Sequence, residues 1–167
     1  MAQEQTTNTH LLNEQSTADI DIWVAKYPEE QKQSAVMAAL RIVQDQNGGW
    51  LTEELMNAVA EYLDMPKIAV YEVATFYSMY EHQPVGRHKI CVCNSISCLL
   101  NGSEKTIDYL QEKLGVKIGE VTTDGKFSIK EVECLGACVG APAIMIGNTY
   151  YENLTPEKID QIMEGLD

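Results

Sequence analysis

The sequence has few basic residues and no long apolar run, and these two absences exclude several classes of protein. Twelve lysines and arginines stand against 25 aspartates and glutamates among the 167 residues, so the formal net charge is −13. A nucleic-acid-binding protein needs basic patches that neutralise phosphates, and an anionic membrane surface attracts basic segments. No apolar stretch approaches the roughly 20 residues that span a bilayer. We therefore expect no nucleic-acid partner and no direct membrane insertion.

Targeting signals and familiar catalytic motifs are also missing. No lysine or arginine precedes Lys26 and no apolar core lies upstream of it, which argues against a secretory signal or a transit peptide. We therefore expect a cytoplasmic protein. No phosphate-binding loop of the form G-x-G-x-x-G occurs, so no nucleotide cofactor is expected on this chain. The three histidines, His10, His82 and His88, are not spaced as metal ligands, and we expect no catalytic acid, base or nucleophile.

Against these absences stand five cysteines, four of which form two tight pairs. Cys93 and Cys98 enclose four residues, and Cys134 and Cys138 enclose three. In a reducing cytoplasm, clustered cysteines more often bind metal or perform redox chemistry than form disulfides, and the odd total disfavours a full disulfide framework. Each pair can direct two thiolates at one metal centre. A four-thiolate site fits either a [2Fe–2S] cluster or a structural zinc ion.

The spacing of the cysteines favours the iron–sulfur cluster without excluding zinc. The commonest zinc knuckle, C-x-x-C, is absent, whereas a four-residue gap occurs in plant-type ferredoxins. The same absence argues against a dithiol oxidoreductase. Cys91 is an alternative to Cys93 as a ligand, because residues two apart on a strand point to the same face. We prefer Cys93, which lies at the expected strand end, and interpret Cys91 as a small buried residue.

The residues between the paired cysteines are small or hydroxylated. Gly136 and Ala137 leave backbone N–H groups free to approach cluster sulfides, and such hydrogen bonds help to set a reduction potential. Ser95 and Ser97 are further candidate donors to the cluster.

Hydrophobic periodicity predicts a helical domain before residue 82. Residues 1–16 are polar and are expected to form a flexible tail, and residues 17–81 a helical domain. Its helices are expected over residues 17–26, with Thr17 as N-cap, over residues 29–45, after Thr52, and after Pro66. The large side chains between Tyr71 and Tyr80 predict burial on more than one side of the last helix. The pattern changes from helical to alternating at residues 82–86, where we place the domain boundary.

Residues 82–167 predict a small sheet flanked by helices, in the order β-α-β-β-β-β-α. A strand over residues 87–92 and a helix over residues 103–114 precede two expected hairpins, around Asp124-Gly125 and Gly147-Asn148. Thr155 caps the last helix. The fold class is thus α+β or α/β, with an N-terminal helical bundle followed by a thioredoxin-like domain. Both cysteine pairs follow strands, where functional loops usually lie.

Several separated segments also carry a family resemblance, over about residues 29–165. They are Gly49-Trp50, residues 70–78, residues 84–88, the Cys93–Cys98 loop with Asn101-Gly102, Gly119-Glu120, Asp124-Gly125, and residues 133–138 with Ala141-Pro142. In these segments and their order the chain resembles the thioredoxin-like [2Fe–2S] subunit of NADH:quinone oxidoreductase (respiratory complex I), which is designated E. The resemblance implies one [2Fe–2S] cluster ligated by Cys93, Cys98, Cys134 and Cys138.

The resemblance further implies partners and a location. The helical domain would dock on the flavin-bearing subunit of the complex I peripheral arm, which is designated F, and the cluster would exchange single electrons with the FMN of that partner. FMN and NADH would be bound by the partner. The cluster would act as a side store that limits the lifetime of the flavin radical. The protein would be cytoplasmic and associated with the inner face of the bacterial plasma membrane through the complex.

Three alternatives remain open at this point. Related subunits occur in NAD-reducing hydrogenases and NAD-dependent formate dehydrogenases, and the sequence separates these poorly. A free-standing ferredoxin-like carrier would not need the additional helical domain. A zinc-stabilised structural module is the third alternative.

Overall fold

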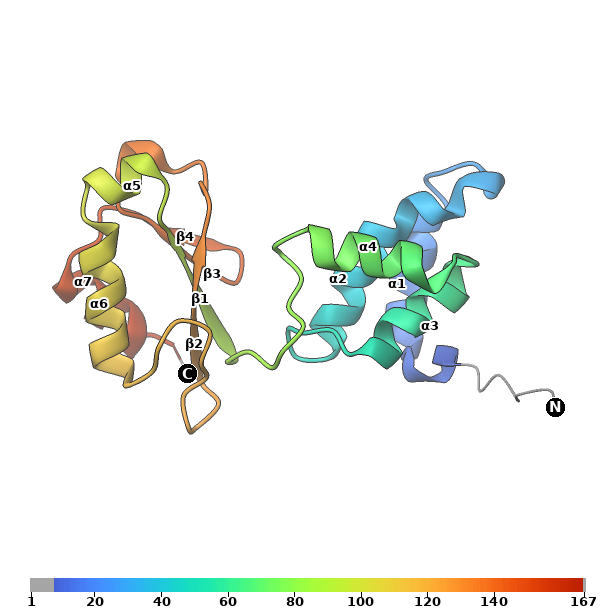
Figure 1. Ribbon diagram of the computed structural model, residues 1–167, viewed down its shortest axis with the longest axis horizontal. Helices are drawn as coiled ribbons and strands as arrows, with labels where there is room; N and C mark the ends of the chain where they lie inside the picture. Colours follow the sequence, from blue (N-terminus) through green and yellow to red (C-terminus); the bar gives the residue numbers. More distant parts are fainter. Residues whose placement is uncertain (1–7, 167) are drawn as a thin grey trace. The chain divides into compact units, whose positions relative to one another are not determined.

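A computed structural model describes residues 8–166, which form two compact units that divide between Pro84 and Val85 (Figure 1). The division falls within residues 82–86, where the sequence changes from a helical to an alternating pattern. None of the described helices combines the length and the apolarity that a membrane-spanning helix needs.

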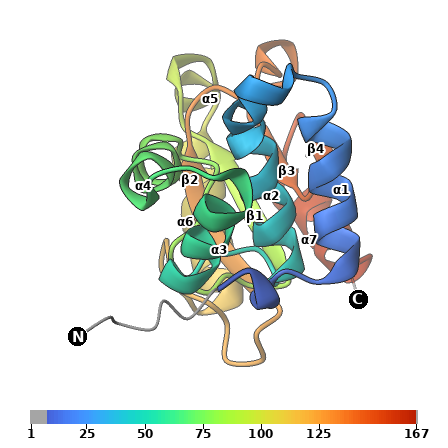
Figure 2. The ribbon, with the colours of Figure 1, turned by 90° about the vertical axis from the view of Figure 1, so that its right-hand side faces the viewer.

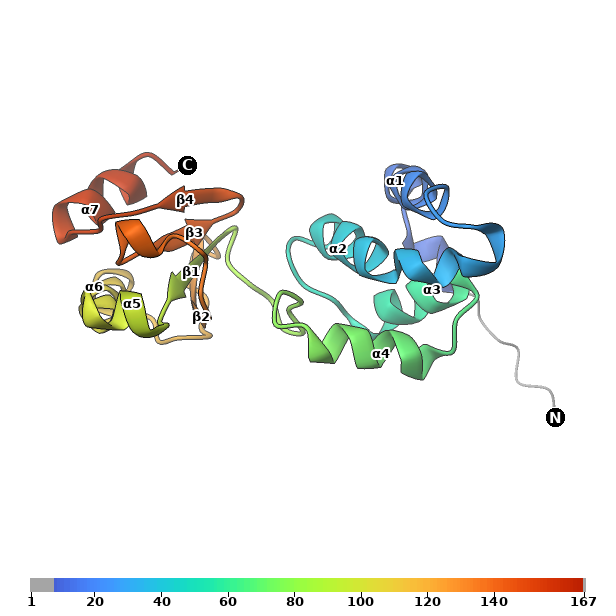
Figure 3. The same ribbon diagram turned by 90° about the horizontal axis from the view of Figure 1, so that it is seen from above.

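The first unit consists of helices packed around one apolar core. Its 3-10 helices are η1 (Asn8–Leu11) and η2 (Glu29–Ala35), and its α-helices are α1 (Glu14–Val24), α2 (Val36–Gln46), α3 (Glu53–Leu63) and α4 (Lys67–Phe76). Helix α1 lies alongside α2 (Figure 2), and α1 and α4 lie on opposite sides of α2 and α3 (Figure 3). The centre of the core contains fully buried Leu40, Val43, Val59, Leu63 and Val70.

The helix expected over residues 29–45 is divided into a 3-10 part and an α-helical part. The 3-10 helix η2 contains Gln31, whose φ of −117° and ψ of 21° are not helical, and the α-helix begins only at Val36. Thr52 is the N-cap of α3 as expected, since its side chain accepts a hydrogen bond from the N–H of Leu55 at 3.2 Å.

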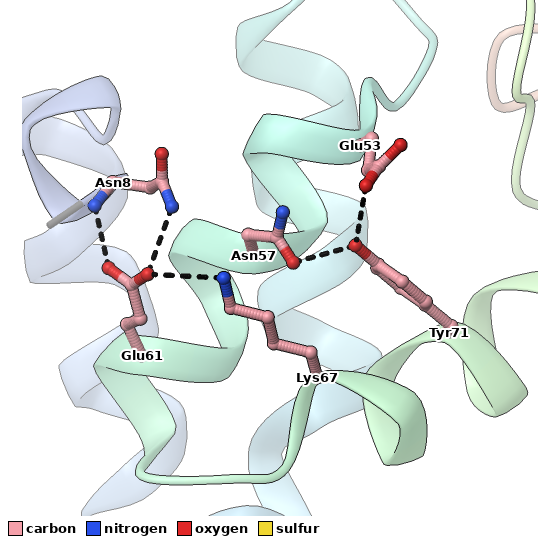
Figure 4. A network of polar contacts seen from close by, with 6 residues as sticks. All are labelled: Asn8, Glu53, Asn57, Glu61, Lys67 and Tyr71. Carbon is pink, nitrogen blue, oxygen red and sulfur yellow. Dashed lines mark hydrogen bonds and ion pairs between the residues drawn. The ribbon is translucent and has the colours of Figure 1, made fainter. Parts of the chain in front are cut away.

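Residues 8–16, which were expected to belong to a flexible tail, are folded. Asn13 rather than Thr17 is the N-cap of α1, because its side-chain oxygen accepts a hydrogen bond from the N–H of Ser16 at 2.7 Å. Asn8 donates from its backbone and its side chain to the Glu61 carboxylate of α3, at 2.6 and 2.9 Å (Figure 4). The rest of the expected tail, residues 1–7, lies outside the described residues.

Polar contacts on the outside of α3 connect it to α4 (Figure 4). The hydroxyl of Tyr71 donates to Oδ1 of Asn57 at 2.7 Å and lies 3.4 Å from Oε1 of Glu53. The ammonium group of Lys67 lies 3.8 Å from Glu61. These contacts direct Tyr71 toward α3 rather than into the core.

The large residues in and after α4 are less buried than the sequence predicts. Of the α4 residues, all of them described, only Val70 and Ala74 are buried. Ile68, Phe76 and Met79 are 64%, 80% and 49% exposed. The prediction of burial on more than one side is therefore wrong for the chain by itself, because α2 and α3 are the helices of the unit that contact α4, and they cover one side of it.

The second unit is a mixed sheet flanked by helices, as expected, but it has four strands where the sequence predicted five. Its strands are β1 (His88–Cys93), β2 (Phe127–Val132), β3 (Ile144–Ile146) and β4 (Thr149–Tyr151), in the order β2-β1-β3-β4. Strands β1 and β2 are parallel, whereas β3 is antiparallel to β1 and to β4. The helical elements are α5 (Ile96–Leu100), α6 (Ser103–Leu114), the 3-10 helix η3 (Cys138–Gly140) and α7 (Pro156–Glu164).

Helices α6 and α7 cover one face of this sheet (Figure 1). Ile90 and Val92 of β1 point toward them and pack in one core cluster with Leu110 of α6 and Ile159 of α7. Cys91 and Cys93 alternate with these residues and therefore point to the other face.

Two local features of the second unit differ from the expectation. The strand expected before Asp124-Gly125 is reduced to one isolated bridge between Val121 and Ser128. There the Asp124 side chain accepts the N–H of Lys126 at 2.9 Å, so side chains stabilise the turn where a longer strand ladder was expected. In addition, the segment between the first two cysteines is not an open loop, because it contains the start of α5.

Candidate metal centre

The four paired cysteines come from two loops at one end of the sheet. Cys93 is the last residue of β1 and Cys98 lies within α5, whereas Cys134 follows β2 and Cys138 begins η3. Because β1 and β2 are parallel, the loops that follow them leave the sheet at the same end of the strands. The register pairs Cys93 with Val132, so Cys134 lies just beyond the last pair of the ladder.

Within each pair the two sulfur atoms are in contact. Cys134 Sγ and Cys138 Sγ are 3.6 Å apart, and Cys93 is hydrogen-bonded to Cys98. Two sulfurs that bind one tetrahedral metal atom at about 2.3 Å are themselves separated by about 3.8 Å. Among residues 8–166, no three histidine, cysteine, aspartate or glutamate side chains converge on a single ion. The Cys134–Cys138 pair is therefore spaced for one metal atom, and two such pairs are what a diiron cluster requires.

Backbone N–H groups from both loops point at the sulfur of Cys93. Burial acts to raise the pKa of this thiol, but hydrogen bonds from the backbone of Ser95 and of Leu135, together with the side chains of Cys98 and Ser95, bring its pKa below the ordinary value. Donors of this kind stabilise a thiolate, which is the form that binds metal. A contact from Leu135 to Cys93 also shows that the second loop reaches the first.

The thiols of Cys98 and Cys138 hold their protons more tightly than usual. Burial, and then the hydrogen bond with Cys93, raise the pKa of Cys98, whereas the hydrogen bond with Cys134 is the main cause that raises the pKa of Cys138. A charge on Cys93 also raises the pKa of Cys138. The two pairs are therefore close enough to interact across the loops.

Gly136 has the backbone conformation that the second loop requires. Its φ of +79° lies in the left-handed region, which side chains rarely adopt. In this conformation its N–H lies 3.4 Å from Cys134 Sγ. The structure therefore places the expected backbone donor of Gly136 against a ligand sulfur.

One side of the centre opens to solvent, and its surroundings are apolar. Cys93 and Cys98 are each 2% exposed, whereas Cys134 and Cys138 are exposed. Ile96, Leu100 and Val139 are 75%, 81% and 105% exposed. No charged residue occurs in residues 90–103 or 134–151 of this acidic chain. We call the exposed side chains of Ile96, Leu99, Leu100 and Val139 the apolar collar.

Cys91 lies in the middle of β1, away from the loops. It is 5% exposed, as expected for a small buried residue, and its neighbours across the sheet are Lys130 and Met145. The packing cluster that contains Cys93 and Cys98 does not include it.

Of the two serines expected to donate to the cluster, Ser95 forms a side-chain hydrogen bond with Cys93 as well as with Glu133, whereas Ser97 has another partner. The hydroxyl of Ser95 donates to Oε2 of Glu133 at 3.1 Å, and that of Ser97 lies 3.4 Å from the carbonyl oxygen of Cys138. Glu133 was not among the residues expected at the site, although its position directly before Cys134 was an available signal.

Comparisons with known proteins identify related sequences over most of the chain. The family model described as "Thioredoxin-like [2Fe-2S] ferredoxin" matches residues 20–167. In Rickettsia bellii, the NADH-quinone oxidoreductase subunit designated E is 50% identical over 143 residues, which cover 86% of this chain and 86% of that protein. The protein of the same name in Rickettsia felis is 45% identical over 141 residues, which cover 84% of each chain.

Among solved structures, an NAD+-reducing [NiFe]-hydrogenase in the air-oxidized state has a similar fold. The match has a TM-score of 0.66 at 21% identity, and it covers 77% of this chain and 22% of the hydrogenase chain. At that identity the likeness shows a shared fold and no more.

Proposed function

Because the chain belongs to the thioredoxin-like [2Fe–2S] ferredoxin family, we propose that it carries single electrons on one [2Fe–2S] cluster held by Cys93, Cys98, Cys134 and Cys138. The observation that carries this proposal is that two hydrogen-bonded thiol pairs follow the parallel strands β1 and β2 at one end of the sheet. The donor set fits the cluster, because backbone N–H groups at the site point at the cysteine sulfurs. When bound, the cluster supplies a one-electron acceptor.

We infer that the parent assembly is an NADH:quinone oxidoreductase. The support is the set of relatives that share the name of that enzyme and the designation E, at 44% to 50% identity over most of the chain. In this role the cluster exchanges electrons with the FMN of a partner flavoprotein, designated F in complex I, which also binds NADH. The assembly would hold the protein at the inner face of the plasma membrane. A place in an NAD-reducing hydrogenase is the alternative, but the likeness to that structure supports the fold alone.

The surface of the second unit supports contact with a partner protein at the cluster. Interface centres are poor in charged residues and rich in apolar ones, and the apolar collar has this composition. The exposed carboxylates of Glu104, Glu133 and Glu152 border the two charge-free segments in the sequence, against one cation, Lys89. Such a rim would repel a second copy of this acidic chain and favour a partner with a basic rim.

Iron and acid-labile sulfide in anaerobically purified protein test the cluster. We expect about two of each per chain, broad visible absorbance bands, and an EPR signal after dithionite reduction. Cys93→Ala is expected to lose the absorbance, whereas Cys91→Ala keeps it, because Cys93 lies at the end of β1 and packs with Cys98. A colourless protein that carries one zinc ion would overturn the electron-transfer role, and the reverse result for the two variants would overturn the ligand set.

Isolation of the intact complex tests the partner. A tagged form of the full chain is expected to co-purify with a flavin-containing protein that binds NADH. Co-purification with hydrogenase subunits instead would overturn the assignment to an NADH:quinone oxidoreductase and leave the cluster assignment intact.

A further inference from the structure

The two cysteine loops are joined by a side-chain contact that the ligand assignment does not need. We propose that Ser95 and Glu133 form a clamp that holds these loops at the separation the cluster requires, and that the Glu133 carboxylate lowers the cluster's reduction potential. This inference rests on the proposed function, because it concerns the cluster that the four cysteines would bind.

The hydroxyl of Ser95 does not cap its own helix. Ser95 is the N-cap residue of α5, with φ −74° and ψ 163°, a position where serine usually accepts a hydrogen bond from the helix. No such side-chain capping bond forms. The hydroxyl instead donates to Oε2 of Glu133, 38 residues away in sequence, at 3.1 Å. A hydrogen bond to a charged acceptor is stronger than one between neutral groups.

A second connection next to the clamp has the same form. The side-chain nitrogen of Asn94 donates to Oε1 of Glu131 at 3.2 Å, and its backbone N–H donates to the carbonyl of Val132 at 3.0 Å. Ser103, which is fully buried, donates to Oδ1 of Asn94 at 2.7 Å and so fixes the orientation of that amide. Consecutive residues of the first loop thus bind the carboxylates of Glu131, in β2, and Glu133, directly after it.

The position of the clamp explains why it is needed. The ladder between β1 and β2 ends at Cys93 and Val132, so no strand pairing holds the chain beyond these residues. Cys134 and Cys138 then lie on an exposed loop. The clamp connects the residue directly before Cys134 to the residue two after Cys93. It therefore fixes the distance between the two ligand pairs without help from the metal.

The charge of Glu133 has a second consequence. Reduction adds one negative charge to the centre, and a carboxylate attached to the residue next to a ligand opposes that charge. Net charge and hydrogen bonds near the sulfurs are among the factors that set cluster potentials. Removal of this charge is expected to raise the potential, whereas removal of the Ser95 hydroxyl leaves the charge in place.

Variants of the full chain separate the effect of the Ser95–Glu133 hydrogen bond from the effect of the Glu133 charge. Ser95→Ala removes the hydrogen bond to Glu133, together with the one to Cys93, and keeps the carboxylate. Glu133→Gln keeps an oxygen that accepts the serine hydroxyl and removes the charge. Ser95→Thr restores a hydroxyl as a rescue. Glu112→Gln removes a carboxylate on the exposed side of α6 and is the matched control for charge.

Two measurements test the proposal. Decay of visible absorbance in the presence of a chelator is expected to be about tenfold faster in Ser95→Ala, as loss of a charge-assisted bond implies, and near wild type in Ser95→Thr. Glu133→Gln is expected to lie between wild type and Ser95→Ala, because it keeps the hydrogen bond but makes its acceptor neutral. In an EPR-monitored titration with dithionite, Glu133→Gln is expected to favour reduction by up to about tenfold, which is about 59 mV for one electron. Glu112→Gln is expected to keep the wild-type potential. Ser95→Ala is expected to lower the potential, the opposite direction from Glu133→Gln, because it also removes the side-chain hydrogen bond to Cys93.

The outcomes distinguish this inference from the proposed function. Wild-type protein without iron would refute the proposed function. Wild-type protein with a cluster, combined with unchanged decay in Ser95→Ala, would refute the clamp. An unchanged potential in Glu133→Gln would refute the role of the charge, and an equal shift in Glu112→Gln would show that the effect is not specific to Glu133.

Discussion

Gly86→Ala is the substitution whose effect follows most directly from the structure. A Cβ atom at Gly86 would lie 2.3 Å from the backbone carbon of Phe127 and 2.6 Å from the backbone nitrogen of Ser128. Both atoms belong to β2, which cannot move without disturbing its ladder with β1. Gly86 also donates its N–H to Oγ of buried Ser128 at 3.0 Å. The added methyl group must therefore push this segment off β2 and break that bond.

The expected cost combines the two effects. Overpacking against a rigid neighbour costs about 1 to 3 kcal/mol, and an unsatisfied buried hydroxyl and N–H cost about 1 to 3 kcal/mol. A total of about 4 kcal/mol is a large part of the stability of a unit of this size. At about 1.4 kcal/mol per factor of ten, it raises the population of the open form of the second unit about a thousandfold.

Hydrogen exchange followed by mass spectrometry measures this population in the intact protein. Peptides that cover β1 and β2 are expected to exchange about a thousandfold faster in Gly86→Ala, a figure that follows from the cost above. Peptides from α2 and α3 of the first unit are an internal control and are expected to keep their rates. Gly165→Ala is the control variant, because its Cβ would meet atoms only at 3.5 and 3.6 Å, which is ordinary contact.

Equal protection of β2 in wild-type and Gly86→Ala protein would refute the steric argument. Equal acceleration in α2 and α3 would refute the independence of the two units, because the damage would then extend across the whole chain.

Two further predictions concern the first unit, which contains both tryptophans and can be followed by their fluorescence during urea unfolding. Asn13→Ala removes the cap of α1, a 2.7 Å bond to the N–H of Ser16, and is expected to cost about 1 kcal/mol; an unchanged midpoint would show that the cap does not stabilise α1. Burial, and then the hydrogen bond to Asp21, raise the pKa of Tyr62 to about 12. Since Tyr62 binds its proton more tightly in the folded state, its contribution to stability is complete below the unfolded pKa of about 10 and is lost as the pH rises to about 12. In Tyr62→Phe this alkaline loss should be smaller, and an identical loss would contradict the assignment.

Local signals predicted many elements correctly. Helix α6 has the expected bounds, and the N-caps Thr52 and Thr155 accept hydrogen bonds from their helices as their positions indicated. These features depend on hydrogen bonds and periodicities within about four residues, so the sequence displays them directly. The hairpin of β3 and β4 was also predicted, because Gly147-Asn148 separates two short alternating segments.

The predictions failed where local signals favoured different structures, or where the structure depends on residues far apart in the sequence. The polar composition of residues 1–16 suggested a tail, yet Glu61 of α3 binds Asn8 and a nearby Asn13 caps α1. The aromatic content of α4 suggested burial, yet the neighbouring helices leave Phe76 exposed. Neither the partner of Asn8 nor the number of helices around α4 can be obtained from spacing.

The chemistry is already visible in the amino-acid sequence: four thiols in two short-range pairs, an acidic chain with charge-free segments around them, and no motif for nucleotides. Folding is what brings the pairs together, because this depends on the parallel pairing of β1 and β2, which carries two distant loops to one end of the sheet. The same pairing places Ser95 against Glu133 and leaves one cysteine pair exposed and the other buried. Hydrogen bonds and burial between residues far apart in sequence leave no periodic signal, so these features appear only in the folded chain.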